Sequence, residues 1–422
     1  MVSDVQAAIA AVARIELPRL VASLARFTRD VGRAEELAQD AIVIALERWP
    51  TDGIPARPGA WLMTTAKRRA LDGVRHARIV EAKQAQLARA DDGDPRAEIA
   101  DVLDDDVGDD LLRLVFTACH PVLSTEARVA LTLRLVGGLT TAEIARAFLV
   151  PEPTISQRIV RAKRALAEAR VPFEVPRAAE RGDRLASVLE VIYLVFNEGH
   201  LATEGASLTR PALCDDALRI ARVLAGLVPA EPEVHGLVAL LELSASRIPA
   251  RTGPTGAPVL LAAQDRSRWD RTLVRHGLAA LDRADQLVAA QRGAAGPYHL
   301  QAGIAAHHAR AVTAEATPWP RIAALYTLLA QRAPSPIVEL NRAVAVGMAF
   351  GPDEGLAIVD ALVADGSLAA YHLLPAVRGD LLAKLGRSEE ARAELQRAAA
   401  LTRNERERDV LLGRARDLAP GA

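Results

Sequence analysis

A basic, polar helix face carries the clearest chemistry in this sequence. It lies in the stretch LTLRLVGGLTTAEIARAFLVPEPTISQRIVRAKRAL, residues 131–166. Apolar residues recur there at steps of four, three and four and predict one buried helical stripe: Ile155, Ile159, Ala162 and Leu166. The opposite face then carries small polar and basic side chains: Thr154, Ser156, Gln157, Arg158, Arg161, Lys163 and Arg164.

A shorter helix precedes this one. Thr141-Ala142-Glu143 predicts a capped, acidic first turn, and Ile144 and Phe148 lie on one apolar face. Leu149-Val150-Pro151 ends this helix, while Pro153 suits the first turn of the next, where a missing N–H is tolerated. Two short helices joined by a tight turn, the second one basic, fit the major groove of DNA. The alternative is a surface helix hairpin with a solvated charged face.

Composition favours a fold built from packed helices. Half of the 422 residues are hydrophobic but only 3% are aromatic, so Ala, Leu and Val supply most apolar side chains. This length suits two or three domains. The formal net charge is −1, so any DNA affinity must come from local patches.

Other classes of site find no support in the sequence. Cys119 and Cys214 are too far apart for a disulfide framework or a zinc site, and the adjacent His307 and His308 point different ways on a helix. A phosphate-binding Gly-Lys loop, a zinc-protease histidine pair and a nucleophile elbow are all missing. We therefore predict a non-enzyme without cofactor, metal or catalytic residues. The sequence lacks a signal peptide and a long apolar run, which predicts a cytoplasmic protein with no membrane partner.

The N-terminal part predicts a helix from Gly32 to Trp49 with two distinct faces. One face is acidic and comprises Glu36, Asp40, Val43 and Glu47. The other face is apolar and comprises Ala38, Ile42, Ala45 and Trp49. A loop rich in Pro and Gly, residues 50–58, separates this helix from a second one that begins at Trp61.

The second helix is basic. The stretch from Lys67 to Lys83 contains six Lys and Arg residues but only two acidic residues, Asp72 and Glu81. Such a run either forms a solvated surface or contacts nucleic acid. After it, the stretch from Asp91 to Asp110 holds ten carboxylates and one base, which predicts an acidic linker over residues 86–110. This linker is either a solvated spacer or a polyanionic strand that threads a basic channel.

Residues 173–422 predict a helical solenoid. A tetratricopeptide-like (TPR-like) spacing of small and apolar residues comprises Gly379, Leu382, Gly386, Ala391, Leu395 and Ala398. A weaker copy, 36 residues earlier, comprises Ala343, Val346, Gly355, Val359 and Leu362. Small residues in this pattern let two antiparallel helices approach closely. Nearer the start of the extension, Asn197-Glu198-Gly199-His200 predicts a glycine-capped helix end.

Taken together, these motifs resemble a bacterial sigma factor of the extracytoplasmic-function group. RAEELAQDAIVIALERWP and WLMTTAKRRALDGVRH match its first domain, here residues 1–85, and the helix-turn-helix matches its second, here residues 111–172. The resemblance implies an all-α protein that binds core RNA polymerase and directs promoter recognition and transcription initiation. Tyr193–His200, Gln264–Asp270 and the repeats resemble the C-terminal extension of one sigma subgroup, which implies that residues 173–422 modulate this activity.

The resemblance also assigns roles to individual residues. The coiled coil of the polymerase largest subunit would bind Glu36, Gln39 and Asp40, while the second domain would meet the polymerase flap. Minus-10 promoter DNA would contact Trp61, Lys67, Arg68, Arg69 and Arg75, and the loop of residues 50–58 would hold a flipped base. Many members of the family carry Asn where this chain has Arg68. Minus-35 DNA would contact Thr154, Ser156, Gln157, Arg158, Arg161 and Lys163, of which the three basic residues mainly grip phosphates.

Two alternatives remain open at the level of sequence. A one-component helix-turn-helix regulator with a ligand- or protein-sensing repeat domain explains the helix-turn-helix and the solenoid. It does not explain the acidic stripe around Asp40 or the basic helix after Trp61. A pure scaffold leaves both basic patches without a role. For the sigma factor, we expect the solenoid to pack on the two sigma domains and to set their spacing.

Overall fold

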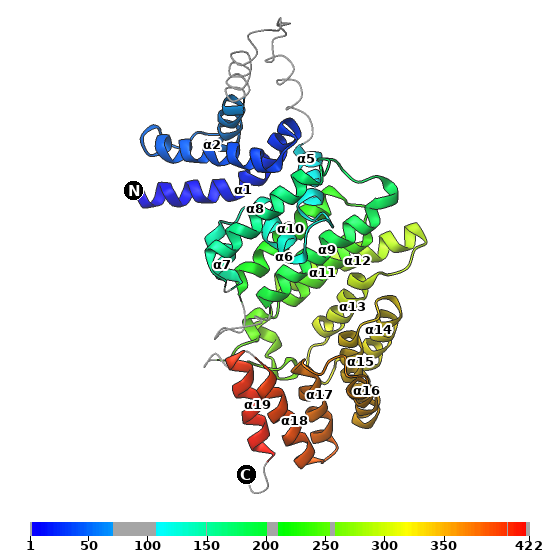
Figure 1. The fold of residues 1–422 in the computed structure, drawn as a ribbon. Coiled ribbons are helices and arrows are strands. Elements are labelled where there is room, and N and C mark those ends of the chain that lie inside the picture. The colour runs from blue at the N-terminus through cyan, green and yellow to red at the C-terminus, as the bar shows by residue number, and fades with distance from the viewer. Residues whose placement is uncertain are drawn as a thin grey trace, which may run out of the picture. The chain divides into compact units, whose positions relative to one another are not determined.

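The computed structural model describes residues 2–70, 107–148, 150–200, 210–253, 258–402 and 404–418. Within these ranges every regular element is a helix, apart from isolated β-bridges such as the one between Thr252 and Pro258 (Figure 1). This confirms the all-α prediction. The chain divides into two compact units, Met1–Ile192 and Tyr193–Ala422.

The first unit begins with two long helices that lie side by side, α1 (Val2–Thr28) and α2 (Val31–Asp52) (Figure 1). Alanines on α2 let the two helices approach closely, and Ala34, Ala38 and Ala41 are fully buried. The helix continues three residues past Trp49, with Pro50 in its last turn, and ends at Gly53, whose φ of 82° favours glycine. A further helix covers residues 58–70.

Four helices complete the part of the first unit that holds the helix-turn-helix: α5 (Val107–Ala118), α6 (Thr125–Leu135), α7 (Thr141–Ala147) and α8 (Glu152–Glu168). Because α5 begins at Val107, Asp109 and Asp110 of the predicted linker lie in the first turn of a helix. A capping box opens α7, but its N-cap is Thr140 rather than the predicted Thr141. Pro153 lies in the first turn of α8, as predicted.

A 23-residue helix, α9 (Ala178–His200), crosses the boundary between the two units. Gly199 is part of this helix and does not cap it. A Cβ atom there would come within 2.8 Å of the Cys214 nitrogen, so the glycine allows α9 to approach α10. The next helices are α10 (Pro211–Leu227), α11 (Pro232–Ala245), α12 (Arg271–Gln291) and α13 (Pro297–Arg310).

The C-terminal helices form a solenoid in which each helix packs mainly on its neighbours in sequence (Figure 1). Glycines bring paired helices together where the repeat pattern predicts it. A Cβ at Gly355 would lie 2.7 Å from the Ala343 carbonyl oxygen, and one at Gly379 would lie 3.1 Å from that of Ala391. The helices are α14 (Trp319–Arg332), α15 (Pro336–Phe350), α16 (Pro352–Asp365), α17 (Leu373–Lys384), α18 (Ser388–Leu401) and α19 (Glu405–Asp417).

A buried histidine makes the stability of the second unit depend on pH. His308 packs edge-on against Trp319, and burial, aided by Arg247 and Arg266, lowers its pKa from 6.5 to about 4. Between these values the unfolded chain binds a proton that the folded chain does not. The His308 contribution to the free energy of unfolding therefore falls by about 3 kcal/mol as the pH drops through this window.

We expect His308→Gln to make the free energy of unfolding less sensitive to acid than in the wild type. Urea unfolding at pH 7.5 and at pH 5 measures this difference. His276→Gln, at an exposed site on α12, is the control and should keep the wild-type pH dependence. Equal pH dependence of the His308 variant and the wild type would contradict the prediction.

Candidate nucleic-acid interface

The outward face of α2 carries the predicted acidic stripe. Asp30 caps the helix by accepting a hydrogen bond from the Arg33 N–H, which fixes the first turn. Glu36 and Asp40 are exposed, and Glu36 forms a 3.0 Å ion pair with Arg33. Gln39 is half-buried and donates a hydrogen bond to a neighbouring carboxylate on the same helix. Glu47, further along the stripe, is exposed as well, so the stripe presents three accessible carboxylates with the Gln39 amide beside them.

The helix over residues 58–70 has one buried apolar face and one exposed basic face. Leu62, Ala66 and Ala70 are buried at steps of four, and the Trp61 ring packs edge-on against Trp49 at 5.3 Å between ring centres. The remaining face is basic: Arg68 and Arg69 are exposed and Lys67 is half-buried. Arg75 lies outside the described residues.

The helix-turn-helix has the geometry predicted from its periodicity. The stripe of Ile155, Ile159, Ala162 and Leu166 on α8 is buried. On the other face, Ser156, Gln157 and Arg161 are exposed, while Thr154 and Arg158 are half-buried. A short helix followed by a longer one, with polar side chains facing out near the start of the second, matches the arrangement that reads a major groove.

Lys163 differs from the other predicted DNA contacts because it already has a protein partner. Its ammonium forms an ion pair with Glu35 of α2, a carboxylate that is 2% exposed. Arg134, at the end of α6, holds the same carboxylate with its Nε 2.6 Å from Oε1, and also donates to the Leu139 carbonyl oxygen at 3.0 Å. Two cations from the helix-turn-helix domain thus meet one buried anion from the N-terminal helices.

Two further contacts join the same two parts of the chain. Arg26 of α1 lies 3.8 Å from Asp110 of α5, which Arg113 also contacts at 2.6 Å. Burial raises the pKa of Asp110, and the two arginines oppose this shift. Gly138, with a φ of 68°, lies against the backbone of Arg14, so that a Cβ there would come within 2.8 Å of the Arg14 oxygen. The N-terminal helices and the helix-turn-helix domain therefore pack directly on one another.

The first half of α9 covers the helix-turn-helix domain. Arg184 donates a 2.7 Å hydrogen bond to the Phe116 carbonyl oxygen, and Ser187 donates one of 2.9 Å to that of Cys119. Arg128 of α6 reaches back to Glu190 at 3.2 Å. Burial raises the pKa of the Cys119 thiol to about 11. Residues beyond the predicted domain end at 172 thus help to enclose this domain.

Glu35, Arg134 and Arg184 were missed at the level of sequence. Glu35 does carry a signal, because it falls on the apolar stripe of α2, seven residues before Ile42 and three before Ala38. A carboxylate in such a stripe needs a cationic partner when buried. The sequence does not say where that partner lies.

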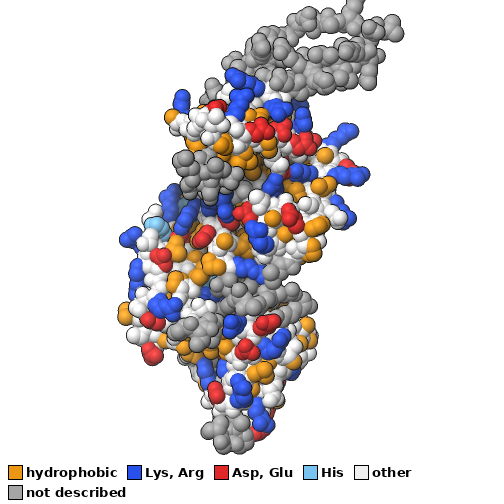
Figure 2. All heavy atoms as spheres, turned by 90° about the vertical axis from the view of Figure 1, so that its left-hand side faces the viewer, with side chains coloured by type: hydrophobic (Ala, Val, Ile, Leu, Met, Phe, Trp, Pro, Cys, Tyr) orange, Lys and Arg blue, Asp and Glu red, His pale blue; other side chains and the backbone are white. Residues whose placement is uncertain are grey.

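The charge distribution agrees with a protein that binds DNA through local patches. On the face shown in Figure 2, Lys and Arg side chains are interspersed with Asp and Glu rather than forming one basic field. Within the described residues, groups of His, Cys, Asp and Glu that could hold a metal ion are absent. The described part of the chain also has no helix both long and apolar enough to cross a membrane.

Comparison with known families assigns three segments of the chain. Residues 13–79 match sigma-70 region 2, and residues 113–166 match sigma-70 region 4. The first match covers most of α1, all of α2 and the helix after the loop. The second covers α6, α7, most of α8 and the second half of α5. Residues 184–285 match a family of unknown function, DUF6596. A one-component regulator would not need the region 2 helices.

Similar proteins include both an uncharacterized relative and named sigma factors. An uncharacterized protein of Rhizobium meliloti (strain 1021) is 44% identical over 388 residues, 92% of this chain and 90% of its own length. The ECF RNA polymerase sigma factor SigK of Mycobacterium ulcerans (strain Agy99) is 34% identical over 155 residues, 35% of this chain and 78% of SigK. SigK of Mycobacterium bovis (strain BCG / Pasteur 1173P2) is 32% identical over 152 residues. With both sigma-70 regions in order, each built as its motifs predict, the chain belongs to the extracytoplasmic-function (ECF) group of sigma-70 factors.

Proposed function

We propose that this alternative sigma factor is closed when free and opens when it binds core RNA polymerase to direct transcription initiation. In the closed arrangement region 2 and region 4 hold each other. The observation that carries the proposal is the burial of Glu35 between Arg134 and Lys163. Sigma factors confer promoter specificity on polymerase and are not enzymes, so the proposal concerns binding and its regulation.

The spacing of promoter elements argues that the two regions must separate. The minus-10 and minus-35 elements lie roughly 25 base pairs apart, about 85 Å along the duplex. In the closed arrangement the Arg134 Nε of region 4 is 2.6 Å from the Glu35 carboxylate of region 2. In this arrangement the two regions lie too close together to bind the minus-10 and minus-35 elements at the same time. Residues 86–106, the predicted linker up to α5, reach at most about 70 Å when fully extended, which allows a separation of tens of ångströms.

Polymerase can start this opening from the surface that remains accessible. Glu36 and Asp40, which we assign to the coiled coil of the polymerase largest subunit, are exposed in the closed arrangement. Gln39 joins them at the edge of the interface with region 4. Polymerase bound to this side of α2 competes with region 4 for the same helix, and so releases Lys163. The polymerase flap then holds region 4 at its new position.

Once open, the two regions have separate DNA roles. For the minus-10 element we assign Trp61, Lys67, Arg68 and Arg69, together with Arg75 outside the described residues. For the minus-35 element we assign Ser156, Gln157 and Thr154 to base edges, and Arg158, Arg161 and Lys163 to phosphates. The exposed positions of Ser156, Gln157 and Arg161 support this division. Because polymerase is the partner, we place this work in the cytoplasm.

The C-terminal extension modulates this activity through region 4. Its first helical turns cover the end of α5, where Arg184 and Ser187 bind backbone carbonyl oxygens. We assign this first half of α9 a supporting role in which it keeps region 4 folded while region 2 engages polymerase. A one-component regulator would instead bind its operator tightly without polymerase.

Substitution of the exposed stripe tests the assignment of the polymerase surface. Glu36→Ala and Asp40→Ala should each weaken binding of the full chain to core polymerase about tenfold, because truncation of a central interface side chain typically costs more than 1 kcal/mol. Asp52→Ala is the matched control, since Asp52 is an exposed acid at the far end of the same helix. Biolayer interferometry with immobilised core enzyme measures the affinities. Unchanged binding of the double variant would refute the assignment.

A further inference from the structure

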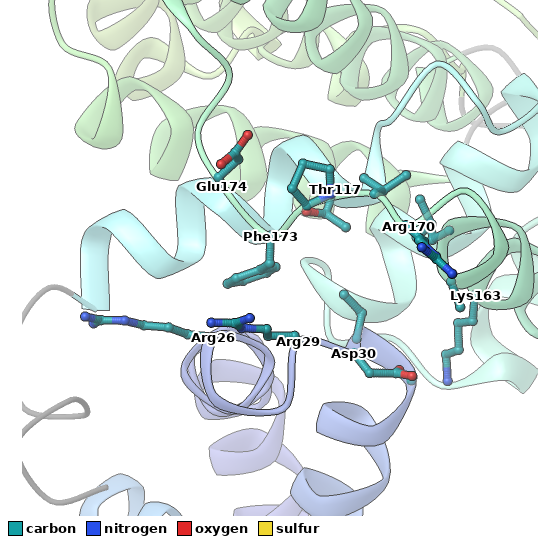
Figure 3. Close-up of a pocket in the computed structure, with 14 residues that line it drawn as sticks. Arg26, Arg29, Asp30, Thr117, Lys163, Arg170, Phe173 and Glu174 are labelled. Atoms are coloured by element: carbon teal, nitrogen blue, oxygen red, sulfur yellow. The ribbon is translucent and has the colours of Figure 1, made fainter. Parts of the chain in front are cut away.

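A cavity of about 600 Å³ lies at the junction of the two sigma regions (Figure 3). Region 2 provides one wall, from the end of α1 to the start of α2, and the other wall comes from α5, α8 and the segment after α8. Its volume falls within the range of about 300–1,000 Å³ that small-molecule sites occupy. Because both regions supply walls, the cavity exists only in the closed arrangement.

Four cationic side chains line the cavity: Arg26, Arg29, Lys163 and Arg170. Only two carboxylates, Asp30 and Glu174, line it with them. Lys163 is paired with Glu35, and Arg26 lies near Asp110. In the described part of the chain, ion pairs involve neither Arg29 nor Arg170, and Asp30 is engaged in capping α2. The cavity therefore has two guanidinium groups that are not ion-paired with any carboxylate of the described residues.

The two arginines occupy equivalent places in the chain. Arg29 directly follows α1 and Arg170 lies two residues after α8, and both have left-handed backbone conformations, with φ of 52° and 47°. Arg29 belongs to region 2, whereas Arg170 follows region 4. A ligand with several anionic groups can bind both guanidinium groups at once, because each offers a planar fork of donors that suits phosphate oxygens.

An aromatic ring completes the lining. Phe173, half-buried, points from the segment after α8 into the cavity, toward the end of α1 where Arg29 lies (Figure 3). Aromatic faces in nucleic-acid-binding proteins stack on bases and contribute about 1–3 kcal/mol per base. Thr117 of α5 also lines the cavity, and its hydroxyl donates a 2.8 Å hydrogen bond to the Arg113 carbonyl oxygen. Cations beside an aromatic face form the chemical complement of a nucleotide.

We propose that this cavity binds a nucleoside polyphosphate, with its base on Phe173 and its phosphates on Arg29 and Arg170. Such a ligand favours the closed arrangement, because it binds the closed form and not the open one. That consequence rests on the proposed closed state of the free sigma factor. The binding itself requires only that the free protein can adopt the closed arrangement, and not that polymerase opens it. A failure of the proposed opening is therefore distinguishable from a failure of nucleotide binding.

Isothermal titration of the full chain with ATP and with GTP tests the site without polymerase or DNA. We expect saturable 1:1 binding of at least one of them, with adenosine or guanosine and inorganic triphosphate each at least tenfold weaker. Arg29→Ala and Arg170→Ala should each reduce the affinity about tenfold. Arg164→Ala should not, because Arg164 is exposed on α8, is paired with Glu168 and does not line the cavity.

Phe173→Leu distinguishes binding of the base from binding of the phosphates. It should weaken nucleotide binding but leave the weak binding of triphosphate unchanged. Three results would overturn the proposal: no binding of either nucleotide at millimolar concentration, nucleotide affinity unaffected by both arginine substitutions, or triphosphate binding as tight as that of the nucleotides. Thermal melting of each variant shows whether it is folded, and Arg29→Lys provides a milder change if Arg29→Ala does not fold.

Discussion

The free protein is expected to bind a promoter duplex at least tenfold more tightly when Glu35 is replaced by Gln. The substitution keeps the shape of the side chain but removes the charge that Arg134 and Lys163 share. Removal of one partner from a buried ion pair costs about 3–5 kcal/mol, and each 1.4 kcal/mol changes an equilibrium tenfold. The closed arrangement loses this free energy and the open one does not. Fluorescence anisotropy at a fixed salt concentration measures the affinity.

The next residue provides a matched control for this experiment. Glu36→Gln alters an exposed carboxylate, so promoter affinity of the free protein should stay unchanged while polymerase binding weakens. Spin labels on cysteines introduced at the exposed Arg48 and Val160 report the distance between region 2 and region 4. The native cysteines are buried and do not compete for the label. An unchanged distance and an unchanged promoter affinity in the Glu35 variant would rule out the closed state as the cause of weak binding.

A fragment that ends at residue 172 is expected to fold poorly in region 4, whereas one that ends at residue 200 should fold. The shorter fragment lacks α9, whose Arg184 and Ser187 bind region 4 and whose Val188 and Val191, on the same face, are fully buried. Burial of each valine contributes about 1.5–3 kcal/mol and each hydrogen bond about 1 kcal/mol. The combined loss of about 5–8 kcal/mol is comparable to the whole stability of a small domain.

The reactivity of the Cys119 thiol measures whether region 4 is folded. The thiol is 1% exposed, and its raised pKa keeps it protonated and unreactive in the intact domain. In the fragment 1–172 it should react rapidly with a thiol reagent, and in the fragment 1–200 only after denaturant is added. In the full chain, Arg184→Ala should lower the melting temperature, whereas Glu180→Ala, at an exposed site on α9, should not. A slow thiol in the shorter fragment would show that region 4 is complete without α9.

Much of the helix-turn-helix could be predicted because its signals are local. The burial of Ile155, Ile159 and Leu166 follows from spacing within a single helix. The predicted N-cap of α7, Thr141, lies one residue after the observed one, Thr140, although the sequence does indicate Thr140. A capping box needs Glu three residues after the cap, and Glu143 therefore selects Thr140. The same locality explains why the glycine contacts between paired repeat helices agree with the pattern.

Features that depend on distant partners could not be predicted in the same way. Glu35 meets residues that lie 99 and 128 positions later in the chain, Arg134 and Lys163, and no local pattern specifies such a pairing. The cavity likewise needs the ends of α1 and α8 to meet. The contact of Arg184 with region 4 could not be predicted because the motif of that region ends earlier in the sequence. The polymerase and DNA contacts of individual residues remain predictions.

The pairing of Lys163 with Glu35 also bears on how the protein behaves among the chromosome's many unrelated sequences. A carboxylate offers an ammonium group much of what a backbone phosphate offers, so Glu35 acts as an internal mimic of DNA. Because Glu35 and region 4 belong to the same chain, the effective concentration of Glu35 near Lys163 reaches about the millimolar range. Random chromosomal sites must compete with it for region 4 and capture few molecules. Polymerase would escape this competition if, as we propose, it binds α2, the helix that carries Glu35.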